Sequence, residues 1–172
     1  MADMLYLRLL REDDFTFVYK LYCEKSQIYW SGHSEEPKEG ALQEWFNNLL
    51  MNPHVISYII SDSNERVGFC RLVIHADNKH ICNDLAISIS EQFRGKGYGT
   101  KAISLLINEA HFKFGIQYMY CWILDTNEAS KKMFIRNGFQ ETGHVREQFI
   151  PLEGRNICMR EYILDITKWS SK

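Results

Sequence analysis

The sequence lacks the segments and pairings that would place it in a membrane or an oxidising compartment. No apolar run is long enough to cross a bilayer, and the stretch from Met1 to Leu10 does not have the layout of a signal peptide. The five cysteines are odd in number, widely spaced and never form a C-x-x-C pair, which argues against a disulfide framework and a zinc site. We therefore expect a reduced, cytoplasmic protein with no membrane partner.

The sequence also has little net charge and no spacing typical of a metal site. Lys and Arg number 20 and Asp and Glu number 22, so the formal net charge is -2 and no basic face is implied. This argues against a nucleic-acid partner. The six histidines show no ligand spacing, and we expect no metal. A chain of 172 residues, 45% of them hydrophobic, suits a single domain spanning 1–172.

Hydrophobic periodicity predicts an α/β fold. Alternating or β-branched runs predict strands at 5–10, 55–60, 67–74, 81–89, 118–124, 139–150 and 156–166. Helical spacing predicts helices at 13–23, 37–51, 103–114 and 127–136. Asp13 or Asp14 is the expected cap of the first helix, and 24–38 is expected to be a loop or a broken helix. The sum is one mostly antiparallel mixed sheet with a central parallel pair, flanked by about four helices.

A glycine-rich turn at Gln92–Thr100 joins the strand at 81–89 to the N-terminus of the clearest helix. The first turn of a helix carries N–H groups without intrahelical partners and a partial positive charge, and glycines allow a phosphate to approach the backbone. The turn therefore predicts an anion site suited to a diphosphate, to which Arg94 and Lys96 add charge. The phosphate loop G-x-x-x-x-G-K-[ST] is absent, and the dinucleotide fingerprint needs a glycine where Thr100 stands.

The spacing Arg94-x-x-Gly97-x-Gly99 resembles the Arg/Gln-x-x-Gly-x-Gly/Ala pattern of the GNAT acetyltransferase superfamily. The stretch from Asn127 to Phe139 resembles the later signature of that family, which is Asn-x-x-Ala/Ser, an aromatic residue and then Gly-Phe. The resemblance covers 5 to about 166. It implies the GNAT fold and transfer of an acetyl group from acetyl-CoA to a primary amine. A non-catalytic acyl-CoA-binding sensor and an ATP-binding domain are the alternatives from other classes.

The resemblance also implies where the coenzyme binds. Backbone amides of the turn would hold the diphosphate, and Arg94 would order the turn and the phosphates. The end of the strand at 81–89 would splay from the strand at 118–124 and offer backbone groups to the coenzyme arm, while Asn127 would cap its helix and bond that arm. The expected coenzyme-binding residues are Ile87, Ile89, Arg94, Gly95, Lys96, Gly97, Tyr98, Gly99, Thr100 and Asn127.

The reaction needs a proton acceptor and a group that stabilises negative charge. An attacking amine must be neutral, although a free alkylamine with a pKa near ~10 mostly is not, so a carboxylate or a water chain must take its proton. We expect Asp84 to be that base, because it lies on the strand that feeds the turn. The backbone N–H of Ile89 is expected to stabilise the oxyanion. Many GNAT enzymes protonate the leaving thiolate with a tyrosine, whose place is held here by Phe134.

The resemblance implies that the acceptor binds at the loop 24–38, and aromatic residues on one face of the strand at 118–124 could form another wall of its pocket. His33, Glu35 and Glu36 are the candidate acceptor-binding residues of the loop, and the two glutamates are second candidates for the base. Tyr120 is the candidate of the strand, where it alternates with Tyr118 and Trp122.

Three features resemble the GNAT branch that contains spermidine acetyltransferases and ribosomal-protein N-terminal acetyltransferases. They are the opening Leu7–Asp14, the turn at 93–98 and the hairpin sequence at 154–156. A polyamine, a protein N-terminus and an amino sugar stay open as acceptors, as does a homodimer. A cluster of Glu35, Glu36, Glu39 and Asp84 would favour a polyamine on electrostatic grounds.

Overall fold

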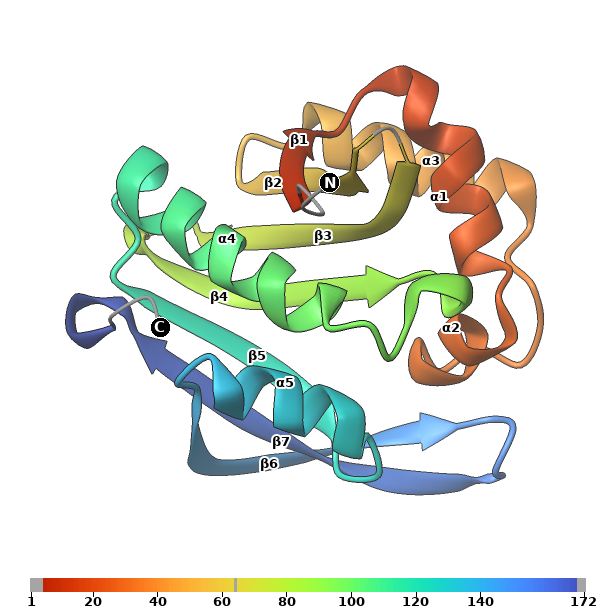
Figure 1. The fold of residues 1–172 in the computed structure, drawn as a ribbon. Coiled ribbons are helices and arrows are strands. Elements are labelled where there is room, and N and C mark those ends of the chain that lie inside the picture. The colour runs from red at the N-terminus through yellow and green to blue at the C-terminus, as the bar shows by residue number, and fades with distance from the viewer. Residues whose placement is uncertain (1–4, 64, 170–172) are drawn as a thin grey trace.

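A computed structural model describes residues 5–63 and 65–169, which form one seven-stranded mixed sheet (Figure 1). The strand order is β1-β2-β3-β4-β5-β7-β6, in which β4 and β5 are parallel and the other neighbouring pairs are antiparallel. The strands are β1 (Leu5–Leu9), β2 (Val55–Asp62), β3 (Glu65–His75), β4 (Asn78–Ile89), β5 (Tyr118–Leu124), β6 (Gln140–Ile150) and β7 (Arg155–Asp165). The predicted sheet with its central parallel pair is confirmed.

Five α-helices cover the sheet within the described ranges. They are α1 (Phe15–Tyr22), α2 (Lys25–Trp30), α3 (Glu39–Met51), α4 (Tyr98–Phe114) and α5 (Glu128–Arg136). α2 is a piece of six residues inside the stretch predicted as a loop or a broken helix, and it accounts for the helix beyond the four expected. The strand order also differs from the chain order, since β7 lies between β5 and β6.

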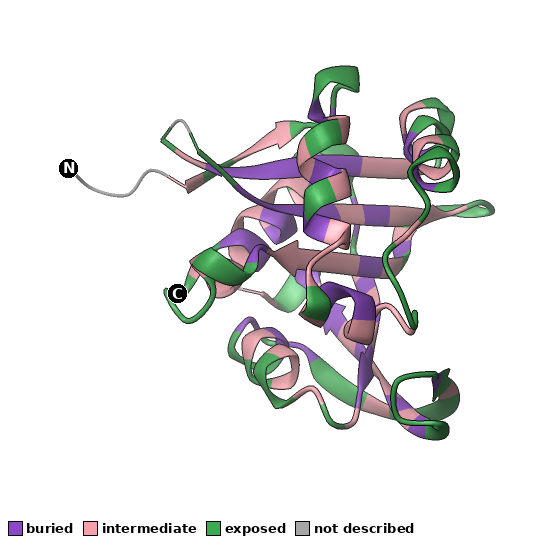
Figure 2. Cartoon of the chain, turned by 90° about the vertical axis from the view of Figure 1, so that its right-hand side faces the viewer, coloured by how far each residue is buried: buried purple, intermediate pink, exposed green. Residues whose placement is uncertain are grey.

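Strand alternation divides the core into a layer on each face of the sheet. Phe69 packs with residues of α1 and α3, whereas its neighbour Cys70 packs with α4, because successive side chains of a strand point to opposite faces. Buried residues accordingly lie along the strands and the inward sides of the helices (Figure 2). We call the two faces the α4 face, which α4 and α5 cover, and the α2 face, which α1, α2 and α3 cover.

The helix predicted after the glycine-rich turn is confirmed as α4. Its buried residues are Ala102, Ile103, Leu106, Ile107 and Ala110, and burying each of the large ones stabilises the fold by roughly 1.5–3 kcal/mol. Gly115 ends the helix in the left-handed conformation with φ 65°, and its N–H donates to the carbonyl of His111. The period of the apolar side chains and the glycine cap were both sufficient to locate this helix from sequence.

Asp14 does not cap α1 with its side chain, in contrast to the expectation for this region. Its fully buried carboxylate accepts hydrogen bonds from Arg8 at 2.7 and 3.0 Å and from the backbone N–H of Arg11 at 2.9 Å, and Arg66 Nε lies 3.0 Å away. Burial by itself raises the pKa of Asp14, but the hydrogen bonds from Arg8 and Arg11 bring it below its usual value. The carboxylate thus joins β1, the start of α1 and β3.

Candidate active site

The two parallel strands separate soon after they meet. β4 and β5 are paired only at Ile81–Tyr118 and Cys82–Met119, although β4 continues to Ile89 and β5 to Leu124. A cavity of about 980 Å³ occupies this gap, and residues from both faces of the sheet line it. The expected splay is therefore present, and it connects the glycine-rich turn on the α4 face with a polar region on the α2 face.

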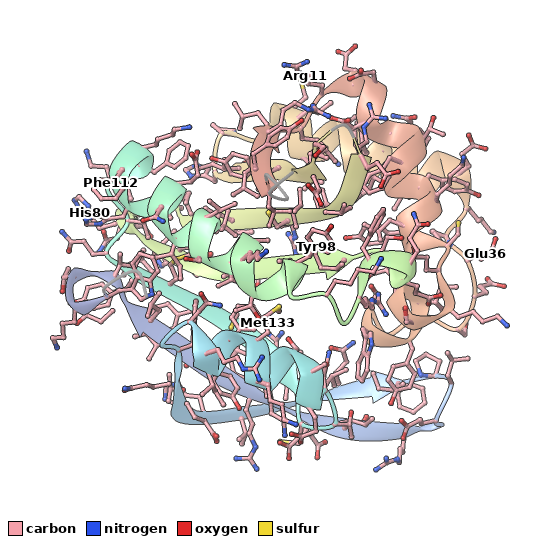
Figure 3. The ribbon with its side chains drawn as sticks, viewed as in Figure 1. Arg11, Glu36, His80, Tyr98, Phe112 and Met133 are labelled. Carbon is pink, nitrogen blue, oxygen red and sulfur yellow. The ribbon has the colours of Figure 1, made fainter. Side chains whose placement is uncertain are left out.

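The glycines of the turn have two distinct structural roles. Gly95 and Gly97 have φ values of +75° and +81°, a backbone conformation that residues other than glycine rarely adopt. Gly97 is also the N-cap of α4. A Cβ on Gly99 would lie 2.5 Å from Sδ of Met133, so this glycine allows α5 to pack against the start of α4, where Figure 3 shows Met133. The shape of the turn thus depends on all three.

The turn presents backbone donors to the cavity. The N–H groups of Gly95, Gly97 and Gly99 have no protein acceptor among the residues that the structure describes. The intrahelical ladder begins with Lys101 N–H donating to the carbonyl of Gly97 at 3.1 Å. Gly95, Gly97, Gly99 and Thr100 line the cavity. The expected geometry for an anion at the start of a helix is therefore present.

Arg94 holds the turn to the end of β4 and to α2. Its Nε donates to the carbonyl of Ile89 at 2.8 Å, its guanidinium donates to Ser26 Oγ at 2.5 Å, and it lies 3.8 Å from Glu24. Ser26 in turn donates to Glu91 through its N–H at 3.0 Å. Arg94 was expected to order both the turn and the phosphates, and these contacts fit the ordering of the turn.

Two other predicted residues of the turn have side chains engaged away from the backbone donors. Lys96 does not line the cavity, and its Nζ lies 5.5 Å from the centre of the Phe93 ring. The hydroxyl of Tyr98 donates to Asp62, and its ring packs edge-on against Phe93.

The end of β4 turns its backbone groups toward the gap. The N–H of Ser90 donates to the carbonyl of Val67 at 3.0 Å, across to β3. Alternate residues of an antiparallel strand direct their backbone groups to opposite edges, so Ile87 and Ile89 direct theirs toward β5. Both residues line the cavity, and the Ile89 carbonyl accepts from Arg94.

Asn127 caps α5 as predicted. Its side-chain oxygen accepts a hydrogen bond from the N–H of Ser130 at 3.1 Å, and the residue lines the cavity. Asn137, at the other end of α5, is buried, and its side chain donates to the carbonyl of Thr100 at 3.2 Å and to that of Met133 at 3.0 Å. The sequence marked Asn137 only as a helix end, whereas it also holds the glycine-rich turn against α5.

Asp84 lies on the α2 face of the cavity, paired with a residue that sequence reasoning missed. Arg71 on β3 donates to its carboxylate at 3.1 Å. Tyr22, at the end of α1, also lines this side, and burial raises its pKa to about 12 while the positive charge of Arg71 opposes that rise. Arg71 and Tyr22 could not be found by spacing, because each comes from a different element of the fold.

The candidate acceptor residues are divided between the cavity and the surface. His33 lines the cavity, whereas Glu35 and Glu36 are exposed and do not line it. Glu36 lies at the outer edge of the molecule (Figure 3). Burial is the main cause that raises the pKa of Cys23, and the charge of Glu36 adds to it. Tyr120 does not line the cavity, but Trp122 on the same face of β5 does. The structure therefore does not bring the four predicted carboxylates together around the cavity.

Phe134 lies in the wall of the cavity and brings no hydroxyl group. It is buried, and its ring packs edge-on against Phe139 with the ring centres 5.0 Å apart. The position expected to protonate a leaving thiolate is thus occupied by an apolar ring that stabilises the core of the α4 face.

The sheet, its splay and the glycine-rich turn form one fold, and comparison with known proteins assigns its family. The model of the acetyltransferase (GNAT) domain matches residues 4–140, so the chain belongs to the GNAT acetyltransferase family. It is an acetyl-CoA-dependent N-acetyltransferase.

Among curated proteins, the spermidine N(1)-acetyltransferase of Vibrio cholerae is 25% identical over 169 residues, which are 95% of each chain. The spermidine N(1)-acetyltransferase of Escherichia coli K12 is 24% identical over 151 residues, 86% of this chain and 79% of that one.

Among solved structures, the spermidine N-acetyltransferase of Vibrio cholerae in complex with CoA and spermine superposes with a TM-score of 0.85. The sequence identity is 20%, and the match covers 95% of this chain and 96% of that one. This likeness establishes the fold. No helix in the described parts of the chain is long and apolar enough to span a membrane.

Proposed function

We propose that the chain transfers the acetyl group of acetyl-CoA to a small primary amine by direct attack in a ternary complex. One observation carries the proposal: a single cavity leads from the free amides of the glycine-rich turn, through the gap between β4 and β5, to the Asp84–Arg71 pair on the opposite face. A thioester delivered from one face would thus meet an amine that enters from the other.

The coenzyme binds on the α4 face. The diphosphate accepts hydrogen bonds from the amides of the turn, of which those of Gly95, Gly97 and Gly99 have no protein acceptor in the described ranges. The pantetheine arm runs beside Ile87 and Ile89, which direct their backbone groups into the gap.

The other proposed coenzyme-binding residues are Arg94, Lys96, Tyr98 and Thr100 of the turn and Asn127 at the start of α5. Arg94 acts by holding the turn, and Lys96 contributes positive charge near it. Asn127 lines the cavity from the start of α5, where a second hydrogen bond to the arm is in reach of its side-chain amide.

The reaction needs one proton removed and one negative charge stabilised. The N–H of Ile89 points toward the gap and stabilises the oxyanion that forms when the amine attacks the thioester carbonyl. Asp84 takes the proton of the amine directly or through water. Phe134 supplies no proton, so the thiolate leaves with the help of water, consistent with a thiol pKa of about 8.5 for a group like Cys.

The proposal is tested by two measurements on the same purified chain. Calorimetry with acetyl-CoA reports binding, and release of coenzyme thiol over a panel of amines reports transfer. We expect saturable binding and turnover with at least one amine. Binding with no turnover on any amine of the panel would contradict the proposed transfer to a small primary amine. Absence of binding would contradict the proposed coenzyme site as well.

A further inference from the structure

Basic side chains outnumber acidic ones around the cavity. Asp84 is the sole carboxylate that lines it within residues 5–63 and 65–169. Five arginine and lysine side chains line it: Arg71, Arg94, Lys132, Arg136 and Arg146. Lys132 and Arg136 belong to α5 on the α4 face, where the phosphates of a coenzyme would neutralise them. On the α2 face Arg71 is paired with Asp84, whereas Arg146 has no carboxylate partner among the described residues.

Arg71 has donor capacity beyond its ion pair. One nitrogen of the guanidinium donates to Asp84 at 3.1 Å, and its other N–H groups have no protein acceptor in the part of the chain that the structure describes. Its side chain is 27% exposed. Arg71 is also the register partner of Ala86, which adjoins Ile87. An anion held by Arg71 would therefore lie beside the place where the thioester meets the amine.

Arg146 is a second cation at the same side, held in place without being neutralised. Its guanidinium carbon lies 4.3 Å from the ring centre of Trp122, which also lines the cavity. No carboxylate of a described residue pairs with it. Stacking on an indole orients a guanidinium and leaves its N–H edges available. Its strand partner in the register is Met159, another residue of the cavity wall.

We infer that the acceptor is a small primary amine that carries its own anionic group, a carboxylate or a phosphonate, held by Arg71 and Arg146. The inference rests on the proposed acetyl transfer and specifies its substrate class. Arginine presents a planar set of donors that matches both anions in a bidentate geometry. With the anion fixed there, the amine lies on the side of Asp84, which removes its proton.

A polyamine lacks the complement that this cavity offers. The single carboxylate of the wall is already paired with Arg71, and the face of Trp122 is covered by Arg146. Two carboxylates outside the wall are engaged elsewhere, since Glu153 pairs with Arg155 and Glu91 accepts from Ser26. A chain of several ammonium groups would meet two guanidinium groups in the wall, where Asp84 is the one carboxylate of the described residues and is already paired.

The experiment compares amines that differ only in the anionic group. Turnover with saturating acetyl-CoA is measured for phenylalanine and phenylalaninamide, for β-alanine and β-alaninamide, for 2-aminoethylphosphonate and ethanolamine, and for spermidine. We expect at least one acid to exceed its neutral counterpart in kcat/KM by about tenfold or more, the value of a charge-assisted hydrogen bond, and spermidine to be the poorer substrate. Comparing the carboxylate pairs with the phosphonate pair shows which of the two anionic groups the site prefers.

Variants assign the effect to the two arginines. R71Q and R146Q should each lower kcat/KM for the preferred acid about tenfold more than they lower kcat/KM for its neutral counterpart. R71K should restore part of the loss, because it keeps the charge but not the bidentate geometry. R11Q removes an exposed arginine at a distant part of the molecule (Figure 3) and serves as the control.

The outcomes separate this inference from the proposed function. Equal turnover of acids and amides, or spermidine as the best substrate, overturns the inference and leaves acetyl transfer in place. Equal losses on acid and amide in R71Q and R146Q also overturn it, since they indicate a structural role. Acetyl-CoA binding without turnover on any amine overturns both.

Discussion

The two sides of the cavity are built from different kinds of group. On the α4 face the proposed binding groups are backbone amides, shaped by glycines and by the start of α4. On the α2 face they are side chains, chiefly the Asp84–Arg71 pair and Arg146 on Trp122. Backbone amides at the start of a helix suit a diphosphate, whereas side chains can differ with the acceptor. The difference indicates that coenzyme and acceptor specificity are separable in this chain.

The largest expected effect concerns the sheet that both sides share. D14N should lower the free energy of unfolding by about 3–5 kcal/mol, because it leaves Arg8 and Arg66 without their buried carboxylate. Urea denaturation at pH 7 measures the loss, and the coenzyme affinity of the folded variant should be unchanged. A large loss of affinity in folded D14N would mean that the two sides are not independent of the rest of the sheet.

The same carboxylate predicts a pH dependence. The pKa of Asp14 is lowered in the folded protein, so its contribution is present above the unfolded value of about 3.9 and is lost as the pH falls through the folded value. Acid titration of stability should therefore show a loss below about pH 4 that D14N does not show. If the stability of the wild type and of D14N fell in parallel with falling pH, Asp14 would not be the cause of the loss.

The second effect separates chemistry from coenzyme binding. D84N should lower kcat by about 100-fold, the lower range for loss of a general base, with little change in the affinity for acetyl-CoA. Steady-state turnover measures kcat, and calorimetry on the same sample measures the affinity for acetyl-CoA. D77N, in the exposed turn between β3 and β4, is the matched control. Equal losses in rate and affinity would make Asp84 a structural residue.

The third effect is the reverse of the second. G97A should weaken acetyl-CoA binding by about tenfold, because a side chain at φ +81° costs about 1–2 kcal/mol. The KM for the amine at saturating coenzyme should stay the same. G40A, in a helix with open space around the glycine, is the control. Unchanged coenzyme affinity in G97A would show that the turn does not hold the diphosphate.

The smallest effect tests the contact between the two sides. Ser26 of α2 accepts from Arg94 and donates to Glu91, so S26A should weaken acetyl-CoA binding by about threefold to tenfold, the range for a hydrogen bond. A similar rise is expected in the KM for the amine, since α2 carries residues of the acceptor side. S34A, an exposed serine of the following loop, should change neither. An effect on one constant alone would show that Arg94 does not couple the sides.

The difference between the two sides also explains what could be predicted from sequence. The glycine-rich turn, α4 and the cap at Asn127 are local patterns, in which the residues that matter are close along the chain. Arg71 and Asp84 lie on different strands, and Arg146 comes from β6, which reaches the cavity only because of the strand register. No spacing in the sequence predicts that Arg71, Asp84 and Arg146 line the same cavity.

Two expectations illustrate the same limit. Charge and position in the loop favoured Glu35 and Glu36 as acceptor residues, yet the structure places their side chains outside the cavity wall and only His33 in it. Their place before an apolar run predicts Asp13 or Asp14 as a helix cap, but tertiary packing pairs Asp14 with Arg8 and Arg66 from two strands. In both cases the role of the side chain depends on the residues around it in the fold, which its sequence neighbours do not reveal.

The most direct measurement is a crystal structure of the chain with coenzyme A and an amine. We expect the diphosphate within hydrogen-bonding distance of the amides of Gly95, Gly97 and Gly99, and the arm beside Ile87 and Ile89, with its sulfur facing Asp84. A coenzyme bound outside the gap between β4 and β5, or a diphosphate that contacts none of these amides, would contradict the assignment of the site.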